Sequence, residues 1–500
     1  MVSVGIVGAG AMGAGIAQVA AAAGHRVLLF DTRAGAAEAA VKSVRAMFAK
    51  LAAKGKMTAE AAADAGARLS AAGTLAELAP AGLVIEAVVE DLDVKRRLFA
   101  ELESLVGADC LLATNTSSLS IPAIAAALRA PQRLVGMHFF NPAPLMELVE
   151  IVGGVASDPA SLAQVEALAR AWGKAPVRAR STPGFIVNRV ARPFYAEGLR
   201  LLAEQAASAA TIDAVLRECG GFRMGPLELT DLIGQDVNFA VTSSVFRAFF
   251  GDPRFAPSLV QQELVEAGWL GRKSGRGFYP YGEGVTPEPP ATEPPASAPE
   301  LITLGGDGPL VESLAQRLST VCGRVVRVAA DQEWVEAGPV VIAASDGRTA
   351  AVRAEQSGPR ELVLVDLALD YARATRLAAT RSPRCSEAAY RLAVGTLQAA
   401  GFAVSPLRDL PGLAVLRTVA MLANEAADAV HYGVASAADV DTAMRKGVNY
   451  PLGPLAWADR LGIGSVRAAL GHLGAFYGED RYRISPLIHQ LHAAGGRFHA

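Results

Sequence analysis

The sequence predicts an α/β Rossmann-type domain with a doubly wound sheet, followed by an all-α domain, then a second degenerate Rossmann-like domain and a second all-α domain. Three observations lead to this prediction. Short apolar runs alternate with helical patterns in the first third of the chain, helical spacing alone follows as far as Gly282, and part of that helical region recurs near the C-terminus. The 500 residues are also too many for one hydrophobic core.

The first domain, predicted over residues 1–183, begins with a strand at Val2–Val7 and a glycine-rich turn, G-A-G-A-M-G. An alanine-rich helix then runs to about Gly24. Because the uncharged stretch Val2–Gly24 contains Gln18 and several glycines and has no basic leader, we do not interpret it as a signal or membrane anchor. Further strands are predicted at Arg26–Phe30, Leu83–Ala87, Leu111–Thr114, Leu134–His138 and Leu148–Val152.

A helical substrate or dimerisation domain is predicted over residues 184–282, and a linker follows at 283–299. Six of the sixteen residues of Gly284–Pro299 are prolines, which is typical of a semi-rigid, solvated linker.

The domain predicted over residues 300–410 again has strand-like runs, at Leu301–Leu310, Pro339–Ser345 and Glu361–Asp366. Its first turn contains Asp307 and Pro309. An acid there repels a pyrophosphate and proline lacks an amide donor, so this domain is predicted to be Rossmann-like in shape without a nucleotide.

The last domain, residues 411–500, repeats the first helical domain. Aligning Gly184–Gly234 with Gly412–Gly462 at a constant offset of 228 gives fifteen identities in fifty-one positions, without gaps. A duplicated helical domain explains this better than chance. Asn188 aligns with Leu416, so the second copy keeps residues that shape the backbone and loses a polar residue suited to chemistry.

Composition argues against several functions. A net charge of −2 does not favour nucleic-acid binding or a basic membrane patch. The cysteines, Cys110, Cys219, Cys322 and Cys385, form no C-x-x-C pair, so no zinc site or disulfide framework is indicated and a reducing cytoplasm is expected. His489 and His492 have helical spacing that could hold a metal, but without a third ligand nearby a surface helix is favoured and no metal is predicted.

The N-terminal loop has the features of a dinucleotide site. Gly8, Gly10 and Gly13 fit G-x-G-x-x-G, where glycines allow a tight turn, close approach of the pyrophosphate and helix–strand packing. Asp31 lies twenty-one residues after Gly10, at the end of the second strand, where a carboxylate accepts from ribose hydroxyls. The carboxylate favours NAD over NADP, while Arg33 leaves some tolerance of NADP open.

Polar residues follow several strands at the edge where ligands bind in open α/β sheets, among them Glu90, Ser117 and His138. A neutral imidazole at His138 is suited to take a hydroxyl proton, and Glu150 could fix its tautomer. Ser117 and Asn188 could hydrogen-bond the substrate oxygen. A buried structural histidine is the alternative for His138 alone, but the polar set around it favours chemistry.

Several assignments have alternatives. Glu147 is the rival acid for His138, but its three-residue offset from Glu150 puts it on the other face of the strand. Glu90 and Lys95 could equally be a solvated helix start. Lys54 and Lys56 are either solvated or cations for an anionic substrate tail. The glycine-rich stretch from Gly271 to Tyr279 is either a cover for cofactor phosphates or a structural turn.

Together, the strings G-A-G-A-M-G, A-T-N-T-S-S-L, G-M-H-F-F-N-P, M-E-L-V-E, T-P-G-F-I-V-N-R, M-G-P-L-E-L-T-D and G-R-K-S-G-R-G-F-Y resemble the 3-hydroxyacyl-CoA dehydrogenase family over about Met1–Tyr281. The tail resembles the family's helical domain a second time, as in longer bacterial 3-hydroxybutyryl-CoA dehydrogenase-like proteins, some of which oxidise 3-hydroxyadipyl-CoA in phenylacetate catabolism. The resemblance implies catalysis by His138 and Glu150, with Ser117 and Asn188 at the substrate oxygen. It also implies that Lys54 contacts CoA.

The residues predicted to contact NAD are Gly8, Gly10, Ala11, Met12, Gly13, Asp31, Glu90, Lys95, Asn115 and Lys273. The expected reaction is NAD-dependent oxidation of a (3S)-3-hydroxyacyl-CoA thioester by a cytoplasmic homodimer that binds neither nucleic acid nor membrane. Two alternatives remain: a dehydrogenase of free 3-hydroxy acids, and an NAD-binding structural or regulatory protein without turnover. The acyl group and the pathway, whether of fatty acids, butanoate or phenylacetate, are not determined by the sequence.

Overall fold

The structure is a computed structural model that describes residues 2–319, 324–356 and 361–499. Its chain forms two compact units. The first comprises residues 1–189 with 429–448, and the second comprises residues 190–428 with 449–500. The domain boundaries predicted from the sequence remain predictions.

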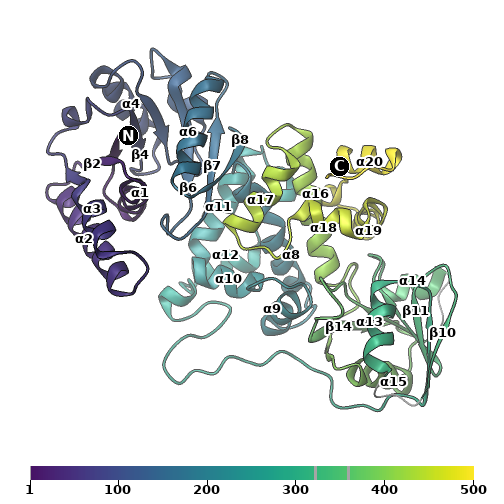
Figure 1. The fold of residues 1–500 in the computed structure, drawn as a ribbon. Coiled ribbons are helices and arrows are strands. Elements are labelled where there is room, and N and C mark those ends of the chain that lie inside the picture. Colours follow the sequence, from purple (N-terminus) through teal and green to yellow (C-terminus); the bar gives the residue numbers. More distant parts are fainter. Residues whose placement is uncertain (1, 320–323, 357–360, 500) are drawn as a thin grey trace. The chain divides into compact units, whose positions relative to one another are not determined.

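The first unit is built on an eight-stranded sheet of order β3-β2-β1-β4-β5-β6-β7-β8, in which only β6 and β7 pair antiparallel (Figure 1). The strands are β1 Ser3–Val7, β2 Arg26–Phe30, β3 Leu69–Ala71, β4 Leu83–Glu86, β5 Leu111–Thr114, β6 Leu134–Phe139, β7 Leu148–Gly153 and β8 Ala175–Arg180. The predicted doubly wound fold is confirmed. The sequence does not predict β3, which has three residues, or β8, whose alternating arginines hide its apolar face.

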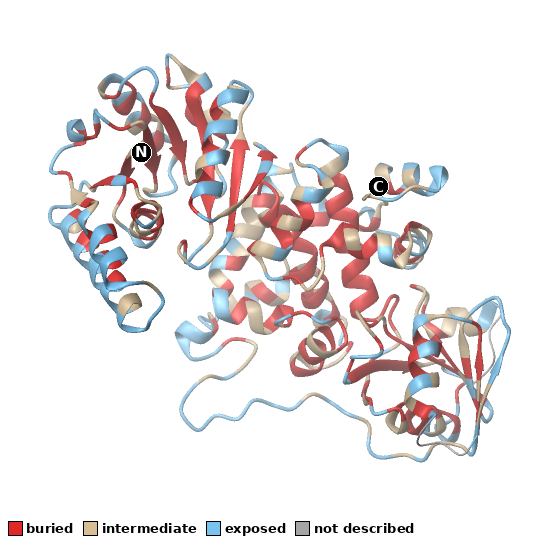
Figure 2. Ribbon diagram, viewed as in Figure 1, coloured by how far each residue is buried: buried red, intermediate tan, exposed pale blue. Residues whose placement is uncertain are grey.

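Helices cover both faces of this sheet. They are α1 Ala11–Ala22, α2 Ala36–Ala53, α3 Ala59–Ala67, α4 Leu92–Leu105, α5 Ile121–Ala125, α6 Pro159–Ala171 and α17 Ala437–Gly447, with α7 Val187–Val190 at the unit's end and short 3-10 turns at η1 Leu75–Leu78 and η2 Pro131–Arg133. Val4 and Ile6 of β1 share a buried cluster with α1, α2, α3 and α6. Gly5 points to the opposite face, against Leu78 of η1. Figure 2 shows the strands as mostly buried, while the helices are buried on one side and exposed on the other.

The strand directions determine where the polar residues collect. Because β1, β2, β4, β5 and β6 are mutually parallel, their carboxyl ends lie along one edge of the sheet. Gly8, Asp31, Asn115 and the last residues of β6 therefore share this edge. On β7, which runs the other way, Glu150 is paired directly with His138.

The second unit contains a seven-stranded mixed sheet of order β10-β9-β11-β12-β13-β14-β15. Its strands are β9 Leu301–Gly305, β10 Arg324–Val328, β11 Trp334–Ala337, β12 Val340–Ala344, β13 Leu362–Val365, β14 Arg376–Arg381 and β15 Ala403–Pro406, with helices α13 Pro309–Leu318, α14 Ala350–Gln356 and α15 Glu387–Ala399. The predicted strands match β9, β12 and β13. The other four carry charged or small residues that break the apolar runs, so the sequence does not predict them.

The glycine turn of this second sheet is closed by the protein itself. The carboxylate of Glu333 accepts hydrogen bonds from the amides of Leu310 (3.1 Å) and Val311 (3.4 Å) at the N-terminus of α13. A Cβ on Gly308 would lie 2.0 Å from the same carboxylate. An acid thus occupies the position that a phosphate takes at the start of a nucleotide-binding helix.

The proline-rich segment 283–299 is mostly exposed, and its second half is also hydrogen-bonded to neighbouring elements. The amide of Ala291 donates to Thr211, that of Glu293 donates to the carbonyl of Val404 on β15, and that of Ala296 donates to Gln398 on α15. These bonds give partners to backbone amides that have none within a helix or strand.

The remaining helices of the second unit belong to the two helical repeats. The first repeat contains α8 Arg192–Ala203, α9 Ala209–Glu218, α10 Pro226–Ile233, α11 Gln235–Ala248 and α12 Leu259–Glu266, with short 3-10 turns at η3 Pro253–Phe255 and η4 Arg272–Ser274. The second contains α16 Val415–His431, α18 Pro454–Leu461, α19 Ile463–Tyr477, η5 Asp480–Tyr482 and α20 Pro486–Ala494, together with α17.

The repeats share unusual backbone conformations at the predicted offset of 228. Phe185 and Leu413 have φ angles of 48° and 49°, and Gly234 and Gly462 have φ angles of 104° and 86°. A positive φ is rare for Phe or Leu. Its recurrence at aligned positions confirms the duplication more strongly than the identities alone.

The repeats also contact each other reciprocally within the second unit. Glu197 accepts hydrogen bonds from Tyr482 (3.1 Å) and Arg417 (2.6 Å). Glu425, which aligns with Glu197, accepts one from Arg254 (3.0 Å), which aligns with Tyr482. Residue i of one repeat thus meets residue j of the other and vice versa, as in a two-fold interface between identical subunits.

Candidate active site

The β1–α1 junction forms an open, glycine-lined turn. Gly8 has a φ of 104°, and a Cβ there would lie 2.5 Å from the carbonyl oxygen of Ala87. At Gly13, a Cβ would lie 1.8 Å from the carbonyl oxygen of Gly8, so only glycine permits this packing. A Cβ on Gly10 would meet nothing within 4 Å, and no side chain caps α1, whose first residues are Ala11 and Met12. The helix N-terminus is therefore free to receive a phosphate.

Asp31 lies beside this turn, in a pocket of about 730 Å³ that Gly8 and Gly10 also line. Its carboxylate accepts hydrogen bonds from the amide of Ala9 (2.8 Å) and from Arg33. The hydrogen bond from Arg33, supported by that from Ala9, overcomes the effect of burial and lowers the pKa of Asp31 to about 2. The acid is therefore ionised at neutral pH. Arg33 is exposed, so it can move aside for a ribose.

His138 and Glu150 form the central pair. Nδ1 of His138 is 2.7 Å from Oε2 of Glu150, and both side chains are buried, at 7 % and 0 % exposure. The other oxygen, Oε1, accepts hydrogen bonds from the amides of Ile186 and Val187, both at 3.0 Å. With Nδ1 facing a carboxylate, the proton is assigned to Nδ1 and the lone pair to Nε2. Phe140 and Phe185 contact the imidazole ring.

A second acidic network braces the loops after β4 and β5. Glu90 accepts hydrogen bonds from the hydroxyl of Thr116 (2.6 Å) and the amide of Ser117 (3.0 Å). Burial raises the pKa of Glu90, but the bond from Thr116 and the charge of Lys95 outweigh it, so the net shift is downward. The position of Ser117 is thus set by Glu90.

Lys95 lies deeper than a phosphate contact would require. It is only 1 % exposed, and its ammonium is 2.5 Å from Glu86 and 3.3 Å from Glu90. Lys95 therefore holds these two acids in place, and its contact with NAD remains a prediction. Glu86 was not predicted as a site residue. The signal for it is a charged residue at the end of the apolar run L-V-I-E, nine residues before Lys95.

The other predicted residues have varied surroundings. The side-chain oxygen of Asn115 accepts a hydrogen bond from the amide of Phe139 (2.8 Å) and so ties the end of β5 to β6. Asn188 is half-buried on α7, directly after the two amides that Glu150 holds. Lys54 is exposed at the end of α2. Lys273 belongs to the second unit, where it pairs with Asp236 at 2.5 Å.

Two further candidates have structural partners. Glu147 is exposed and pairs with Lys446. The stretch from Gly271 to Tyr279 packs on Asp231, which accepts from the amides of Phe278 and Tyr279, both at 3.0 Å. These bonds form a structural turn, and the alternative that the stretch covers cofactor phosphates remains open.

Potential metal ligands are scattered in the described part of the chain. His489 on α20 accepts from Arg467 at 3.3 Å. Cys110, Cys219 and Cys385 are buried free thiols, and Cys322 lies outside the described residues. Among the residues described, no group of three or more histidines, cysteines or acids is placed to hold a metal ion. Within that same part of the chain, no helix is both long and apolar enough to cross a bilayer.

A Rossmann sheet with an open glycine turn, an ionised acid after β2 and a buried His–Glu pair at the same edge defines a nicotinamide-dependent dehydrogenase. Comparison with known proteins gives the family. A model of the NAD-binding domain of 3-hydroxyacyl-CoA dehydrogenase matches residues 3–182, and a model of its C-terminal domain matches twice, at 184–281 and 412–498. A model of the 3-hydroxybutyryl-CoA dehydrogenase reduced Rossmann-fold domain matches residues 342–411. The chain belongs to the 3-hydroxyacyl-CoA dehydrogenase family and is an oxidoreductase whose cofactor is NAD.

Relatives cover the chain to different extents. It is 46% identical to the 3-hydroxyadipyl-CoA dehydrogenase of Escherichia coli over 98% of this chain and 97% of that protein. The probable 3-hydroxybutyryl-CoA dehydrogenase of Bacillus subtilis is 41% identical over 56% of this chain and 96% of its own. A crystal structure of 3-hydroxybutyryl-CoA dehydrogenase from Escherichia coli superposes with a TM-score of 0.90 at 44% identity, covering 99% of both chains.

Proposed function

We propose that the protein oxidises a (3S)-3-hydroxyacyl-CoA to the 3-oxoacyl-CoA, with His138 as general base and Glu150 as its orienting acid. The observation that carries this proposal is the 2.7 Å contact between Nδ1 of His138 and Glu150, which leaves Nε2 free to accept a proton. The stereochemistry follows from the family resemblance.

Residues of this chain transfer the proton. Nε2 of His138 accepts it from the substrate hydroxyl, and the negative charge of Glu150 stabilises the imidazolium that results. Glu150 is held by the amides of Ile186 and Val187, so it cannot turn away when the charge develops. Bound NAD supplies the acceptor for the hydride that leaves C3.

Ser117 and Asn188 are proposed to hydrogen-bond the substrate oxygen. Ser117 is held by Glu90 through its amide, and Asn188 follows the amides that Glu150 fixes. Ser117 is thus tied to Glu90, and the residue before Asn188 is tied to the buried Glu150. Such preorganisation is what stabilises charge as it develops on an oxygen.

NAD fits the first sheet. Gly8, Gly10, Ala11, Met12 and Gly13 would surround the pyrophosphate, and Asp31 would accept from the adenosine ribose. Glu90, Lys95, Asn115 and Lys273 remain proposed cofactor contacts.

The substrate is proposed to be 3-hydroxyadipyl-CoA or 3-hydroxybutyryl-CoA, the compounds in the names of the relatives. The exposed ammonium of Lys54 is proposed to contact the CoA moiety. The hydroxyadipyl enzyme matches nearly the whole chain, and so does the structure titled 3-hydroxybutyryl-CoA dehydrogenase, so both acyl groups remain candidates.

The homodimer expected from the sequence remains a proposal. The reciprocal contact between the two helical repeats supplies within one chain an interface of the kind that two subunits would share. Analytical ultracentrifugation distinguishes a monomer from a dimer.

The test is a substrate panel. NADH formation is followed with 3-hydroxybutyryl-CoA, longer 3-hydroxyacyl-CoA thioesters, 3-hydroxyadipyl-CoA and free 3-hydroxybutyrate. Oxidation of thioesters alone is expected. Turnover of the free acid alone would support the free-acid dehydrogenase, and intact NAD binding without any turnover would support the non-catalytic alternative.

A further inference from the structure

A segment from the C-terminal part of the chain, residues 429–448, belongs to the first unit. It contains α17, which packs on β7 and β8, the two strands at one edge of the first sheet. Ala443 and Met444 of this helix are fully buried. The second helical repeat therefore supplies packing to the sheet that carries His138 and Glu150.

The connection between β8 and α7 leads to the amides that hold Glu150. β8 ends at Arg180, and α7 begins at Val187. The amides of Ile186 and Val187 donate hydrogen bonds to one oxygen of Glu150, both at 3.0 Å. Because these bonds fix the acid to the connection, the place of the connection determines where the acid can face His138.

The segment holds the first end of this connection at Arg180. The amide of Arg180 donates a hydrogen bond to the carbonyl of Val434 at 2.8 Å, and its guanidinium donates to the carbonyl of Tyr432 at 3.3 Å. Val434 is 2 % exposed. Within the described sheet β8 is an edge strand, so the carbonyl of Val434 gives this amide the partner that another strand would otherwise supply.

The segment holds the second end at Val187. Gly447 is the last residue of α17, and a Cβ there would lie 2.6 Å from Cδ2 of Leu148 and 3.1 Å from Cγ2 of Val187. Glycine is a poor helix former, and this close approach gives a physical reason for it. Leu148 is fully buried and lies two residues before Glu150 on β7, so both side chains are on one face of the strand.

The second sheet makes a similar contact without a glycine. There α9 packs on β14, and at the offset of 228 Gly447 aligns with Cys219 and Leu148 aligns with Arg376. The thiol of Cys219 donates to the carbonyl of Leu367 at 3.1 Å. A residue with a side chain is therefore compatible with this helix-on-strand contact, and the glycine belongs to the copy that packs beside Glu150.

We infer that segment 429–448 positions the catalytic acid Glu150, because it holds both ends of the connection whose amides bind that acid. The inference rests on the proposed function and gives part of the duplicated C-terminal half a role in the same site. Gly447 is a positioning residue that acts through Val187 and Leu148. A general base works only within hydrogen-bond reach of its proton, so a small displacement of the acid that orients His138 lowers turnover.

The experiment replaces the glycine in the full-length chain. Gly447→Val places methyl groups where Leu148 and Val187 already lie, so α17 and the connection have to move apart. With the thioester that the wild type oxidises fastest, kcat is expected to fall roughly 10–100-fold, while KM for NAD stays unchanged. An unchanged kcat would overturn the inference.

A double-mutant cycle separates positioning from a general loss of structure. In the Glu150→Gln background the charge that the segment positions is absent, so adding Gly447→Val is expected to lower kcat less than about threefold. The same fold-loss in both backgrounds would assign Gly447 a purely structural role and overturn the inference.

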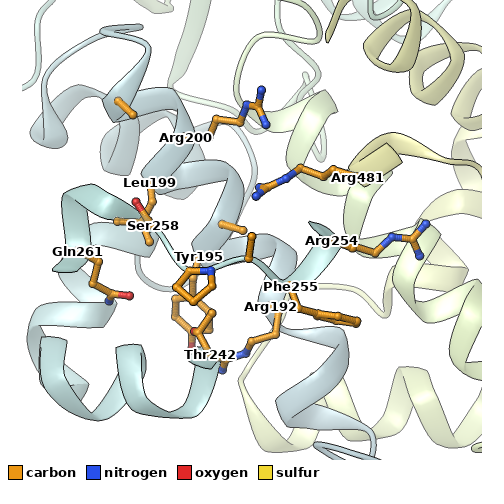
Figure 3. A pocket seen from close by; sticks show the side chains of 14 residues that line it. Arg192, Tyr195, Leu199, Arg200, Thr242, Arg254, Phe255, Ser258, Gln261 and Arg481 are labelled. Carbon is orange, nitrogen blue, oxygen red and sulfur yellow. The ribbon is translucent and has the colours of Figure 1, made fainter. Parts of the chain in front are cut away.

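Two controls lie in the second unit. Gly471 of α19 is also helical, and a Cβ there meets nothing within 4 Å, so Gly471→Val is expected to keep kcat. Leu199 lines a cavity of about 150 Å³ (Figure 3), so Leu199→Ala enlarges the cavity and lowers stability, with kcat expected to persist. If Leu199→Ala lowers kcat as much as Gly447→Val does, kcat follows stability and the inference fails.

A smaller substitution covers the case in which Gly447→Val does not fold. Gly447→Ala adds only the Cβ and is expected to lower kcat several-fold. Leu148→Val removes the δ-carbons that this Cβ would meet, so the double variant is expected to regain most of the lost kcat. A double variant as slow as Gly447→Ala would contradict the contact on which the inference depends.

Hydrogen exchange distinguishes this inference from the proposed function. If the wild type oxidises no thioester, the proposed function fails, but the hold on the connection can still be measured at the amides of Ile186 and Val187. Gly447→Val is expected to accelerate their exchange at least about tenfold, and Gly471→Val is expected to leave it unchanged. Equal exchange in the two variants would overturn the inference.

Discussion

The two sheets place different residues at the same structural position. In the first, β6 pairs with β7 and brings His138 opposite Glu150; in the second, β13 pairs with β14 in the same register, with every partner shifted by 228. At that offset His138 aligns with Asp366, and Glu150 aligns with Ala378. The offset holds through β8 and β15 and through α6 and α15, well outside the aligned helical repeat.

The comparison shows what the acid does in each sheet. Glu150 accepts from the amides of Ile186 and Val187, and Asp366 accepts from those of Ala414 and Val415, at the same offset. Fixing the start of the following helix is therefore a structural requirement that an acid on either strand satisfies. An imidazole is not needed to fix the start of the helix. This is the strongest structural argument for a catalytic role of His138.

The largest expected effect comes from His138. Replacement by Ala should lower kcat roughly 10²–10⁴-fold because the proton acceptor is lost. NAD affinity should change little, since the glycine turn and Asp31 are untouched. Initial rates of NADH formation and NAD titration check both expectations. Asp366→Asn is the control at the corresponding position and should keep kcat; equal losses in both variants would contradict the distinction.

Glu150→Gln should lower kcat roughly 10–10³-fold, because the amide cannot stabilise the imidazolium as a carboxylate does. The amides of Ile186 and Val187 still have an oxygen acceptor in this variant, so the fold should persist. Steady-state rates together with circular dichroism separate the two effects. Full activity in a folded variant would show that the acid serves only the backbone, as Asp366 does.

The nucleotide ends of the two sheets differ as well: the turn of the first is open beside Asp31, and that of the second is filled by Glu333. Asp31→Ala combined with Thr32→Arg should shift the NADP/NAD ratio of kcat/KM roughly 10–100-fold toward NADP, because the acid that repels a 2′-phosphate is replaced by a cation. A variant that remains unable to use NADP would show that another residue senses the ribose.

The smallest expected effect is a pH dependence of stability from Asp366. Burial raises its pKa from 3.8 to about 6 despite the amide hydrogen bonds. The folded state then binds more protons than the unfolded state between these values, so Asp366 should reduce stability by about 1–2 kcal/mol as pH rises from 4 to 6. Urea unfolding at several pH values measures this slope. Asp366→Asn should flatten it, and an unchanged slope would assign it to other groups.

Much of the fold could be predicted because its signals are local. The apolar runs gave six of the eight strands of the first sheet, and G-x-G-x-x-G with Asp31 located the NAD turn. The helical repeat was visible because glycines and prolines with fixed conformations persist through divergence. Short or charged strands such as β3, β8 and β10 were not predicted. They lack an apolar run of their own, and they form because adjacent strands of the sheet pair with them.

By itself the sequence determined the class of fold, the family resemblance and the residues His138, Glu150, Ser117 and Asn188 as candidates. Only the tertiary structure decided that Lys95 is buried against Glu86, that Glu333 fills the second glycine turn and that Asp366 replaces the His–Glu pair. The reason is physical: spacing along the chain fixes which face of a strand or helix a residue occupies. Burial and pairing depend on segments far away in sequence, and these determine whether a charge meets water, an acid or a ligand.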